Sequence, residues 1–384
     1  MPRRLFIIAG EASGDAHGGK LAAALLARDP TLILEGTGGA AMEKAGVRLR
    51  HDIRHLGVVG VIEVLSQWRG IWRAYRHICS HLRTDPPAAL ILIDYPDFNL
   101  RVARVARRLG IPVIYYVSPQ IWAWRPARIK AIAARVDLML VLFAFETDLY
   151  RAAGVPCRWV GHPLLDEESS ATDRETFAAR HQLASGERVL ALLPGSRALE
   201  VSRLLPTMLA AAERLCAEGL FDRVMLAAAP SIDMGLIDGI TASAHSRVRV
   251  TVTSGEASEV LRVARAAVVA SGTATLQAAV IGTPLVMVYR VAPFTAWIGR
   301  RLITSPHLAL VNVVAGRRVV PELVQEAMTV ENIVGELGNL VSDETKDRAM
   351  RDGLAEVRAT LGAPGASARA ADAILDHVTR GAAA

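Results

Sequence analysis

The sequence lacks any long apolar run. The longest uninterrupted stretch covers residues 138–145, far fewer than the roughly 20 residues that a helix needs to cross a bilayer. The apolar stretch after Pro2-Arg3-Arg4 ends at Glu11 and is too short for the core of a signal peptide. We therefore expect a protein that is soluble or peripheral to a membrane.

Cysteine is also scarce, with Cys79, Cys157 and Cys216 as the only three and no CxxC pair among them. This scarcity excludes a disulfide-stapled fold and favours a reducing cytoplasm. Intrinsic disorder is excluded as well, because apolar residues make up 52% of the 384 residues and charged residues only 21%.

Lysine is rare among the 44 basic residues, which include only Lys20, Lys44, Lys130 and Lys346. Against 38 acidic residues the basic ones leave a net charge of +6. This balance favours anionic partners, whether phosphates, nucleic acid or an acidic lipid surface.

Short apolar runs alternate with helical stretches along the chain. Continuous hydrophobicity predicts buried parallel strands, here at 5–9, 90–93, 113–117 and 138–143, and again at 189–193, 224–228, 267–270 and 285–289. A helix at 100–109, followed by Gly110 and Pro112, lies between two of them. The pattern predicts an α/β fold with two Rossmann-like domains facing across a cleft.

The polar segment 166–174 follows Gly161-His162-Pro163 and is interpreted as a linker. We place the first domain at 1–165, a second domain at 166–350 and a helical tail at 351–384. The tail contains an Ala-rich helix at 366–378, which is expected to pack back on the first domain.

The first of two notable loops, Pro194-Gly195-Ser196-Arg197, ends a predicted strand and begins a helix. Apolar residues mark one face of that helix: Val201, Leu204, Leu205, Met208, Ala212 and Leu215. Free N–H groups and the helix dipole favour an anion at such a helix start, where Ser196 adds a hydroxyl and Arg197 a forked charge. An ordinary turn with a capping serine is the alternative.

The second loop follows strand 267–270 and begins another helix. Its residues Ser271, Gly272, Thr273 and Thr275 supply three hydroxyls and a glycine, which suit a diphosphate, and Gln277 lies one turn further on, within reach of a ribose. A small-residue turn with a hydroxyl cap explains this loop equally well when it is taken alone. Two such loops in one domain suggest a nucleotide diphosphate laid across adjacent helix starts.

In the first half, Asp94 stands at the end of an apolar strand and Asp97 follows three residues later. A carboxylate at a strand tip, against an apolar wall, can act as a general base on a substrate hydroxyl. Capping of the next helix is the alternative role for both residues.

A weaker signal is the GxGxxA match at 36–41, which would permit a dinucleotide-binding interpretation with Asp52 as a loose acidic candidate. No metal is predicted, because the histidines show no ligand spacing; those considered are His17, His51, His55, His162 and His307.

One predicted helix is amphipathic and basic. Its apolar side includes Val61, Leu65, Trp68, Trp72 and Tyr75, with Arg69, Arg73 and Arg76 on a flank. Aromatic residues beside arginines suit an anionic bilayer surface, so Trp68, Trp72, Arg69 and Arg73 are candidate membrane contacts. Ordinary core packing is the alternative.

Together these segments resemble the lipid-A-disaccharide synthase family, glycosyltransferases with the two-domain GT-B fold. The resemblance runs in order through most of the chain: 9–15, 57–65, 94–99, 116–125, 161–163, 193–197, 270–277 and 311–317. The segment Ser118-Pro119-Gln120-Ile121-Trp122-Ala123-Trp124-Arg125 is the most specific, because no general turn or core chemistry demands it.

The resemblance implies a reaction. A UDP-2,3-diacylglucosamine donor gives its sugar to the 6-hydroxyl of 2,3-diacylglucosamine 1-phosphate, with inversion, and releases UDP. The base of the family falls on Asp94, and its essential Arg and Asn fall on Arg197 and Asn312. No metal or organic cofactor is implied, and Gln277 stands where similar proteins usually carry Glu.

The resemblance also implies a place and partners. Acylated substrates imply a peripheral enzyme on the anionic cytoplasmic face of the inner membrane of a Gram-negative bacterium, with no nucleic-acid partner. The sequence leaves the oligomeric state open, a homodimer included.

Three alternatives differ in class. Another GT-B protein, such as the peptidoglycan glycosyltransferase or a UDP-sugar epimerase, would share UDP binding and differ in its acceptor. A nicotinamide-dependent oxidoreductase rests on residues 36–41. A basic protein that binds nucleic acid or membrane without catalysis ranks last, because it leaves both helix-start loops and Asp94 unexplained.

Overall fold

The computed structural model describes residues 3–52, 61–122, 126–170, 172–243, 250–293, 295–296 and 305–381. Contacts between residues divide the chain into two compact units, Met1–Asp166 with Leu361–Ala384, and Glu167–Thr360. The sequence interpretation places its borders after residues 165 and 350, whereas the contacts place them after residues 166 and 360.

The first unit is built on a parallel sheet in the order β3-β2-β1-β4-β5-β6-β7. Its strands are β1 (Arg4–Ala9), β2 (Ile33–Gly38), β3 (Arg48–Asp52), β4 (Ala89–Ile93), β5 (Val113–Tyr116), β6 (Leu138–Val141) and β7 (Cys157–Trp159). The helices are α1 (Ala12–Arg28), α2 (Ala40–Lys44), α3 (Val61–Thr84), α4 (Pro96–Arg108), α5 (Arg128–Ala133), α6 (Glu146–Ala152) and α17 (Ala366–Gly381). Helix α7 (Leu164–Ser170) spans the border between the two units in the sequence.

The second unit has a parallel sheet in the order β10-β9-β8-β11-β12-β13. Its strands are β8 (Val189–Leu193), β9 (Arg223–Ala228), β10 (Val250–Ser254), β11 (Ala264–Ala270), β12 (Leu285–Tyr289) and β13 (Glu322–Val324). The helices are α8 (Arg174–Arg180), α9 (Ala198–Ala217), α10 (Met234–Ser243), α11 (Ala257–Val263), α12 (Thr273–Ile281), α14 (Leu310–Ala315), η2 (Gln325–Ala327), α15 (Val330–Ser342) and α16 (Glu344–Thr360).

Hydrophobicity that continues along the predicted strands corresponds to burial on both faces. Every residue of β4, β5, β6 and β8 is buried, as expected where helices cover both sides of a parallel sheet. The apolar face predicted for α9 is confirmed, because all six of its named residues are buried. The α/β fold class is therefore confirmed within each unit.

Several predicted boundaries are wrong. The strand predicted at 113–117 ends at Tyr116, because Val117 has a positive φ of 63° and cannot continue it. The helix predicted from residue 100 begins at Pro96, because the first turn of a helix accommodates a proline. The linker expected at 166–174 is largely helical, since α7 reaches Ser170 and α8 begins at Arg174.

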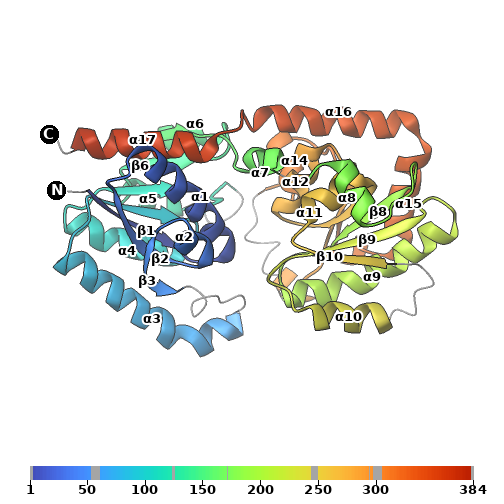
Figure 1. Cartoon of the computed structure of the whole chain (residues 1–384), viewed down its shortest axis with the longest axis horizontal. Helices are drawn as coiled ribbons and strands as arrows, with labels where there is room; N and C mark the ends of the chain where they lie inside the picture. The colour runs from blue at the N-terminus through green and yellow to red at the C-terminus, as the bar shows by residue number, and fades with distance from the viewer. Residues whose placement is uncertain are drawn as a thin grey trace. The chain divides into compact units, whose positions relative to one another are not determined.

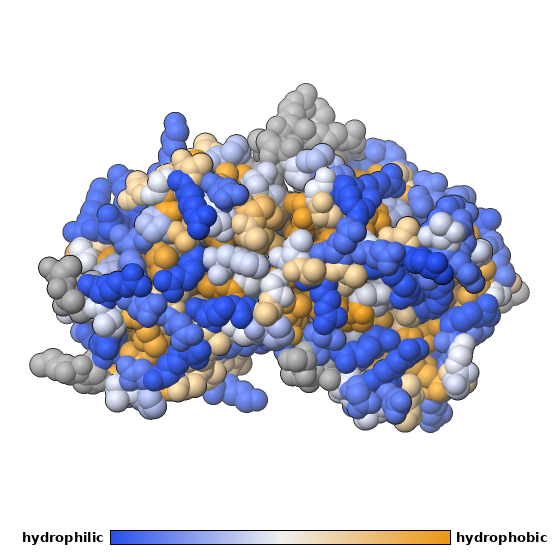
Figure 2. Space-filling model, turned by 90° about the horizontal axis from the view of Figure 1, so that it is seen from above, coloured by the Kyte–Doolittle hydropathy of each residue, from blue (hydrophilic) through white to orange (hydrophobic). Residues whose placement is uncertain are grey.

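The C-terminal helix α17 packs against α1, and the two helices lie next to each other in Figure 1. An ion pair between Arg28 and Asp372, together with a hydrogen bond from Arg3 to Thr379 (2.7 Å), ties the two ends of the first unit together. Hydrophilic side chains predominate on the face of the molecule seen in Figure 2. Among the residues that the structure describes, none of the helices is both long and apolar enough for a membrane span.

Candidate active site

Each sheet contains one point where the strand order reverses. In the first unit β1 and β4 are parallel neighbours, and in the second unit β8 and β11 are. Ligands of open α/β sheets bind outside the carboxyl ends of the strands at such a point. Asp94 follows β4 there, and the loops that start at Pro194 and Ser271 follow β8 and β11.

The backbone around Asp94 adopts an unusual conformation. Asp94 (φ 47°), Tyr95 (φ 45°) and Val117 (φ 63°) all have positive φ, and the Asp94 N–H donates to the Tyr116 carbonyl (3.4 Å). Each such residue costs on the order of 1–3 kcal/mol and persists only where its surroundings hold it. Strain of this kind concentrates at functional sites, which supports a functional role for Asp94.

Several contacts hold this turn in place. The buried Asn99 amide donates to the Asp94 carbonyl (2.7 Å), and the Tyr115 hydroxyl donates to the same oxygen (2.5 Å). Gly10, at the end of β1, packs so closely that a Cβ there would lie 2.3 Å from the Tyr95 ring. The Asp94 side chain itself is half-buried, so its carboxylate is held at the sheet edge without being sealed off. Asp97, in the first turn of α4, forms an ion pair with Arg128 (2.5 Å).

A carboxylate in the first turn of α9, Glu200, contacts the loop before that helix and was not among the predicted site residues. Gly195 has φ 107°, and the Ser196 N–H donates to the Glu200 carboxylate (3.3 Å). Burial raises the pKa of Glu200, and the charge of the nearby Arg197 opposes that shift. Arg197 is exposed at the N-cap of α9. An N–H group of the predicted anion loop is thus already capped by an acidic side chain.

The loop before α12 uses its hydroxyls unequally. The Ser271 hydroxyl donates to the Leu308 carbonyl (3.0 Å), and the fully buried Thr275 hydroxyl donates to the Gly272 carbonyl (2.9 Å). Thr273 is exposed at the helix start, where the first N–H groups of a helix have no partner within it. The Gln277 side-chain amide donates to the Ser258 hydroxyl (2.7 Å).

Asn312 lies on α14 with 0% of its surface exposed. Its amide group donates to the Val320 carbonyl (2.9 Å) and to Glu322 (2.7 Å), and its oxygen accepts from the Val319 and Val320 N–H groups (2.7 and 2.9 Å). Its full hydrogen-bonding capacity is therefore used inside the protein.

Two buried polar residues, Glu146 and His162, lie near the carboxyl edge of the first sheet, and the sequence analysis assigned neither of them a role at the site. Glu146 accepts from the Ser118 hydroxyl (2.5 Å) and the Trp122 indole (3.2 Å), and burial raises its pKa. Burial, with a smaller effect of His17, lowers the pKa of His162 to about 3. The only signal for Glu146 was its place after a predicted strand, and periodicity alone does not reveal such a contact.

The GxGxxA match has a structural explanation. A Cβ at Gly36 would lie 2.0 Å from the Ile7 carbonyl oxygen of the neighbouring strand. The start of α2, where a pyrophosphate would sit, is capped by Asp15, whose carboxylate accepts from the N–H groups of Gly39 (2.7 Å) and Met42 (3.1 Å). The dinucleotide interpretation therefore loses its support.

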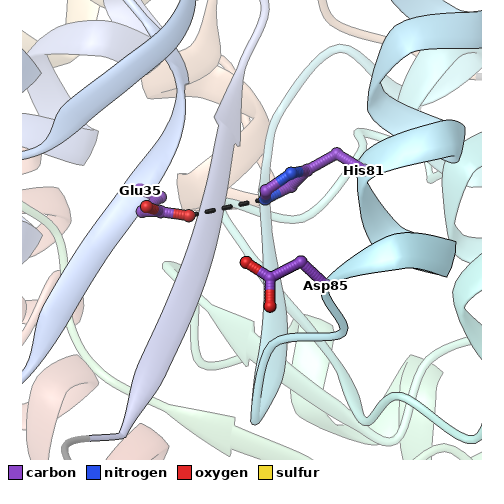
Figure 3. Close-up of side chains that lie close together, drawn as sticks. All are labelled: Glu35, His81 and Asp85. Carbon is purple, nitrogen blue, oxygen red and sulfur yellow. Dashed lines mark ion pairs between the residues drawn. The ribbon is translucent and has the colours of Figure 1, made fainter.

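One group of potential metal ligands, Glu35, His81 and Asp85, lies in the first unit (Figure 3). Glu35 forms an ion pair with Arg50 (2.7 Å), and Asp85 forms one with Arg4, the first residue of β1. Arginines thus balance both carboxylates near the starting ends of the strands, away from the carboxyl edge. We interpret the group as a structural ion-pair cluster.

Helix α3 buries Ala74 and Ile78 but leaves Trp72 46% exposed. Trp72 stacks on Tyr75 (centroids 5.3 Å apart), and Arg73 is exposed beside it. Core packing therefore does not account for Trp72. The side chains of the other two predicted membrane contacts, Trp68 and Arg69, lie outside the described part of the chain.

Solved structures share this fold over nearly the whole chain. An S. aureus MnaA–UDP co-structure matches with a TM-score of 0.69 and 10% identity over 98% of this chain and 97% of that one. The calicheamicin glycosyltransferase CalG4 matches with a TM-score of 0.64 and 15% identity, covering 99% of both chains. Two Rossmann-like sheets with helix-start loops at their switch points define a protein of the GT-B class.

Sequence comparison narrows this class. The family model for lipid-A-disaccharide synthetase matches residues 5–374. The lipid-A-disaccharide synthase of Geobacter metallireducens is 43% identical over 375 residues, covering 97% of both chains. That of Myxococcus xanthus is 44% identical over 381 residues, covering 99% of both. The chain belongs to the lipid-A-disaccharide synthetase family, glycosyltransferases of lipid A biosynthesis.

Proposed function

We propose that this chain transfers 2,3-diacylglucosamine from UDP-2,3-diacylglucosamine to the 6-hydroxyl of 2,3-diacylglucosamine 1-phosphate, which gives a β-1,6 disaccharide and UDP. The observation that carries the proposal is the family match across residues 5–374. The strained Asp94 turn and the two helix-start loops, all at switch points, supply groups suited to this chemistry.

In the proposed mechanism Asp94 is the general base. Its carboxylate takes the proton of the acceptor 6-hydroxyl as that oxygen attacks C1 of the donor sugar from the face opposite UDP. The bond from C1 to the UDP oxygen breaks in the same step, so an α-linked donor gives a β-linked product. General base catalysis of this kind contributes about 10²–10⁴-fold to a rate.

The second unit is proposed to hold the donor. The loop of Gly195, Ser196 and Arg197 and the helix start at Gly272 and Thr273 would bind the diphosphate, with Arg197 neutralising charge on the departing UDP. Ser271 and Gln277 complete the site, Gln277 toward the ribose. Because the Thr275 hydroxyl donates to the Gly272 carbonyl, Thr275 would support the loop without touching the nucleotide.

Both proposed substrates carry acyl chains, so the enzyme must meet them at a bilayer. We propose that α3 binds the anionic cytoplasmic face of the inner membrane through Trp68, Trp72, Arg69 and Arg73. The support is the exposure of Trp72 beside Arg73, on a helix that buries Ala74 and Ile78.

A product assay tests the reaction and the base together. Wild-type protein, given both lipid substrates, should yield the disaccharide 1-phosphate by mass spectrometry. Asp94→Asn keeps the side-chain shape but removes its basicity, so turnover should fall by about 10²-fold or more while UDP affinity stays unchanged. Asp97→Asn, an exposed carboxylate three residues away, serves as the matched control and should keep its turnover.

The outcomes separate the claims. If the wild type forms no disaccharide, the proposed reaction is wrong. If Asp94→Asn retains near-normal turnover, another group is the base, although the reaction stands.

A further inference from the structure

Asn312 belongs to the donor unit, and any role that it has toward the donor rests on the proposed function. Asn312 has no exposed surface, and its side-chain amide forms hydrogen bonds with Val319, Val320 and Glu322. A side chain in this position cannot reach a nucleotide without giving up bonds that bury it. Leaving those partners unsatisfied would carry the desolvation penalty of each buried group.

Glu322, the first residue of β13, joins Asn312 to the segment before α14. Its carboxylate accepts from the Asn312 amide (2.7 Å), the Leu308 N–H (3.0 Å) and the Ala309 N–H (3.1 Å). The Glu322 side chain is only 14% exposed. A largely buried carboxylate that accepts three N–H donors fixes the direction of the groups that donate to it.

The peptide between Leu308 and Ala309 leads directly to the donor loop. Its N–H donates to Glu322, and its carbonyl accepts the hydroxyl of Ser271 (3.0 Å), which follows β11 at the switch point. Hydrogen bonds in such a chain polarise and strengthen one another in a low-dielectric interior. The orientation of Ser271 is thus coupled to Glu322 through one peptide.

We propose that Asn312 and Glu322 are positioning residues, which hold the Leu308–Ala309 peptide so that Ser271 is fixed for the UDP-sugar donor. Neither residue touches the nucleotide. Asn312 contributes by fixing Glu322 and the 319–320 backbone, and Glu322 contributes by aligning the peptide. This assigns Asn312 an indirect role and adds Glu322 to the donor site.

The test is a double-mutant cycle on UDP affinity, measured by calorimetry. Glu322→Gln places an amide against N–H donors and should weaken UDP binding by about tenfold, and Ser271→Ala should weaken it by a similar factor. Because both act through one hydrogen-bond chain, the double variant should bind about as weakly as either single one. Glu331→Gln, an exposed carboxylate in α15, is the control and should bind like the wild type.

If the two effects multiply, or if Glu322→Gln binds UDP like the wild type, the inference is wrong. A merely structural role for Glu322 would lower the melting temperature while leaving the effect of Ser271→Ala unchanged. Asn312→Asp, which sets an acceptor against the Val320 carbonyl and Glu322, should reproduce the loss of affinity.

A measurement on the unmodified chain covers the case in which these variants do not fold. Saturating UDP should slow hydrogen exchange at the Leu308 and Ala309 amides, since their bonds to Glu322 tighten with the donor loop. Exchange that stays unchanged at saturation overturns the inference. A wild type that binds no UDP overturns the proposed function instead, so the two failures are distinguishable.

Discussion

Burial changes the pKa of individual polar side chains at the carboxyl edges of the sheets. His162 is an example: it is buried in the first unit, and its Nδ1 accepts the Leu164 N–H (3.2 Å). A neutral imidazole is favoured there, and its pKa falls from 6.5 to about 3.

This shift predicts a pH dependence of stability. Between pH 6.5 and about 3 the unfolded chain binds a proton at His162 that the native chain does not. The stabilisation is therefore complete above pH 6.5, and it declines by about 1.4 kcal/mol per pH unit as the pH falls toward 3.

Urea unfolding of the wild type and His162→Asn, between about pH 7 and pH 5, measures this effect. Asparagine can still accept from Leu164 but does not titrate, so its stability should depend less steeply on pH. Equal pH slopes for the two proteins would show that His162 is not held neutral by the fold.

Sequence reasoning found some of the candidate site residues and missed others for a physical reason. Asp94, Gly195 and Ser271 follow predicted strands, so the strand–loop–helix pattern was enough to find them. Glu146 and Glu322 were missed because their partners lie on other elements, and periodicity carries no such information. The burial of Asn312 was equally hidden, because nothing local distinguishes a buried amide from one that faces a ligand.

Among whole elements, the strands buried on both faces were the most predictable, because their hydrophobicity is continuous. Five strands were not assigned. Polar residues such as Glu35, Arg50 and Thr253 interrupt β2, β3 and β10, and β7 and β13 have only 3 residues each. Boundaries failed where a single backbone conformation decides them, as Val117 does at the end of β5.

The proposed binding of α3 to a membrane depends on its tryptophans. Trp68→Ser together with Trp72→Ser should lower binding to anionic vesicles severalfold in sedimentation, because aromatic area is removed from the interface. Unchanged far-ultraviolet circular dichroism would show that the double variant keeps its fold.

Leu109→Ser is a suitable control for α3, because Leu109 is another exposed apolar residue of the first unit, 39% exposed after α4. It should sediment with vesicles like the wild type. Unchanged sedimentation of the tryptophan variant would remove α3 from the membrane-binding account.

At the scale of the molecule, both sheets have the same strand order. In each sheet the second and third strands of the sequence lie on one side of the first strand, and the later strands lie on its other side. The fold alone does not define the reaction. The MnaA–UDP co-structure and the calicheamicin glycosyltransferase CalG4 share this fold at 10% and 15% identity. Family membership separates this chain from such proteins, whereas the switch points indicate where a nucleotide would bind.

The central claim is that the second unit binds the diphosphate of the donor between the loop before α9 and the start of α12. A crystal structure of the chain soaked in UDP tests it most directly. We predict diphosphate oxygens within hydrogen-bonding distance of Ser196, Arg197 and the N–H groups at Gly272 and Thr273. UDP bound at any other place, or no bound UDP at a saturating concentration, would contradict the account.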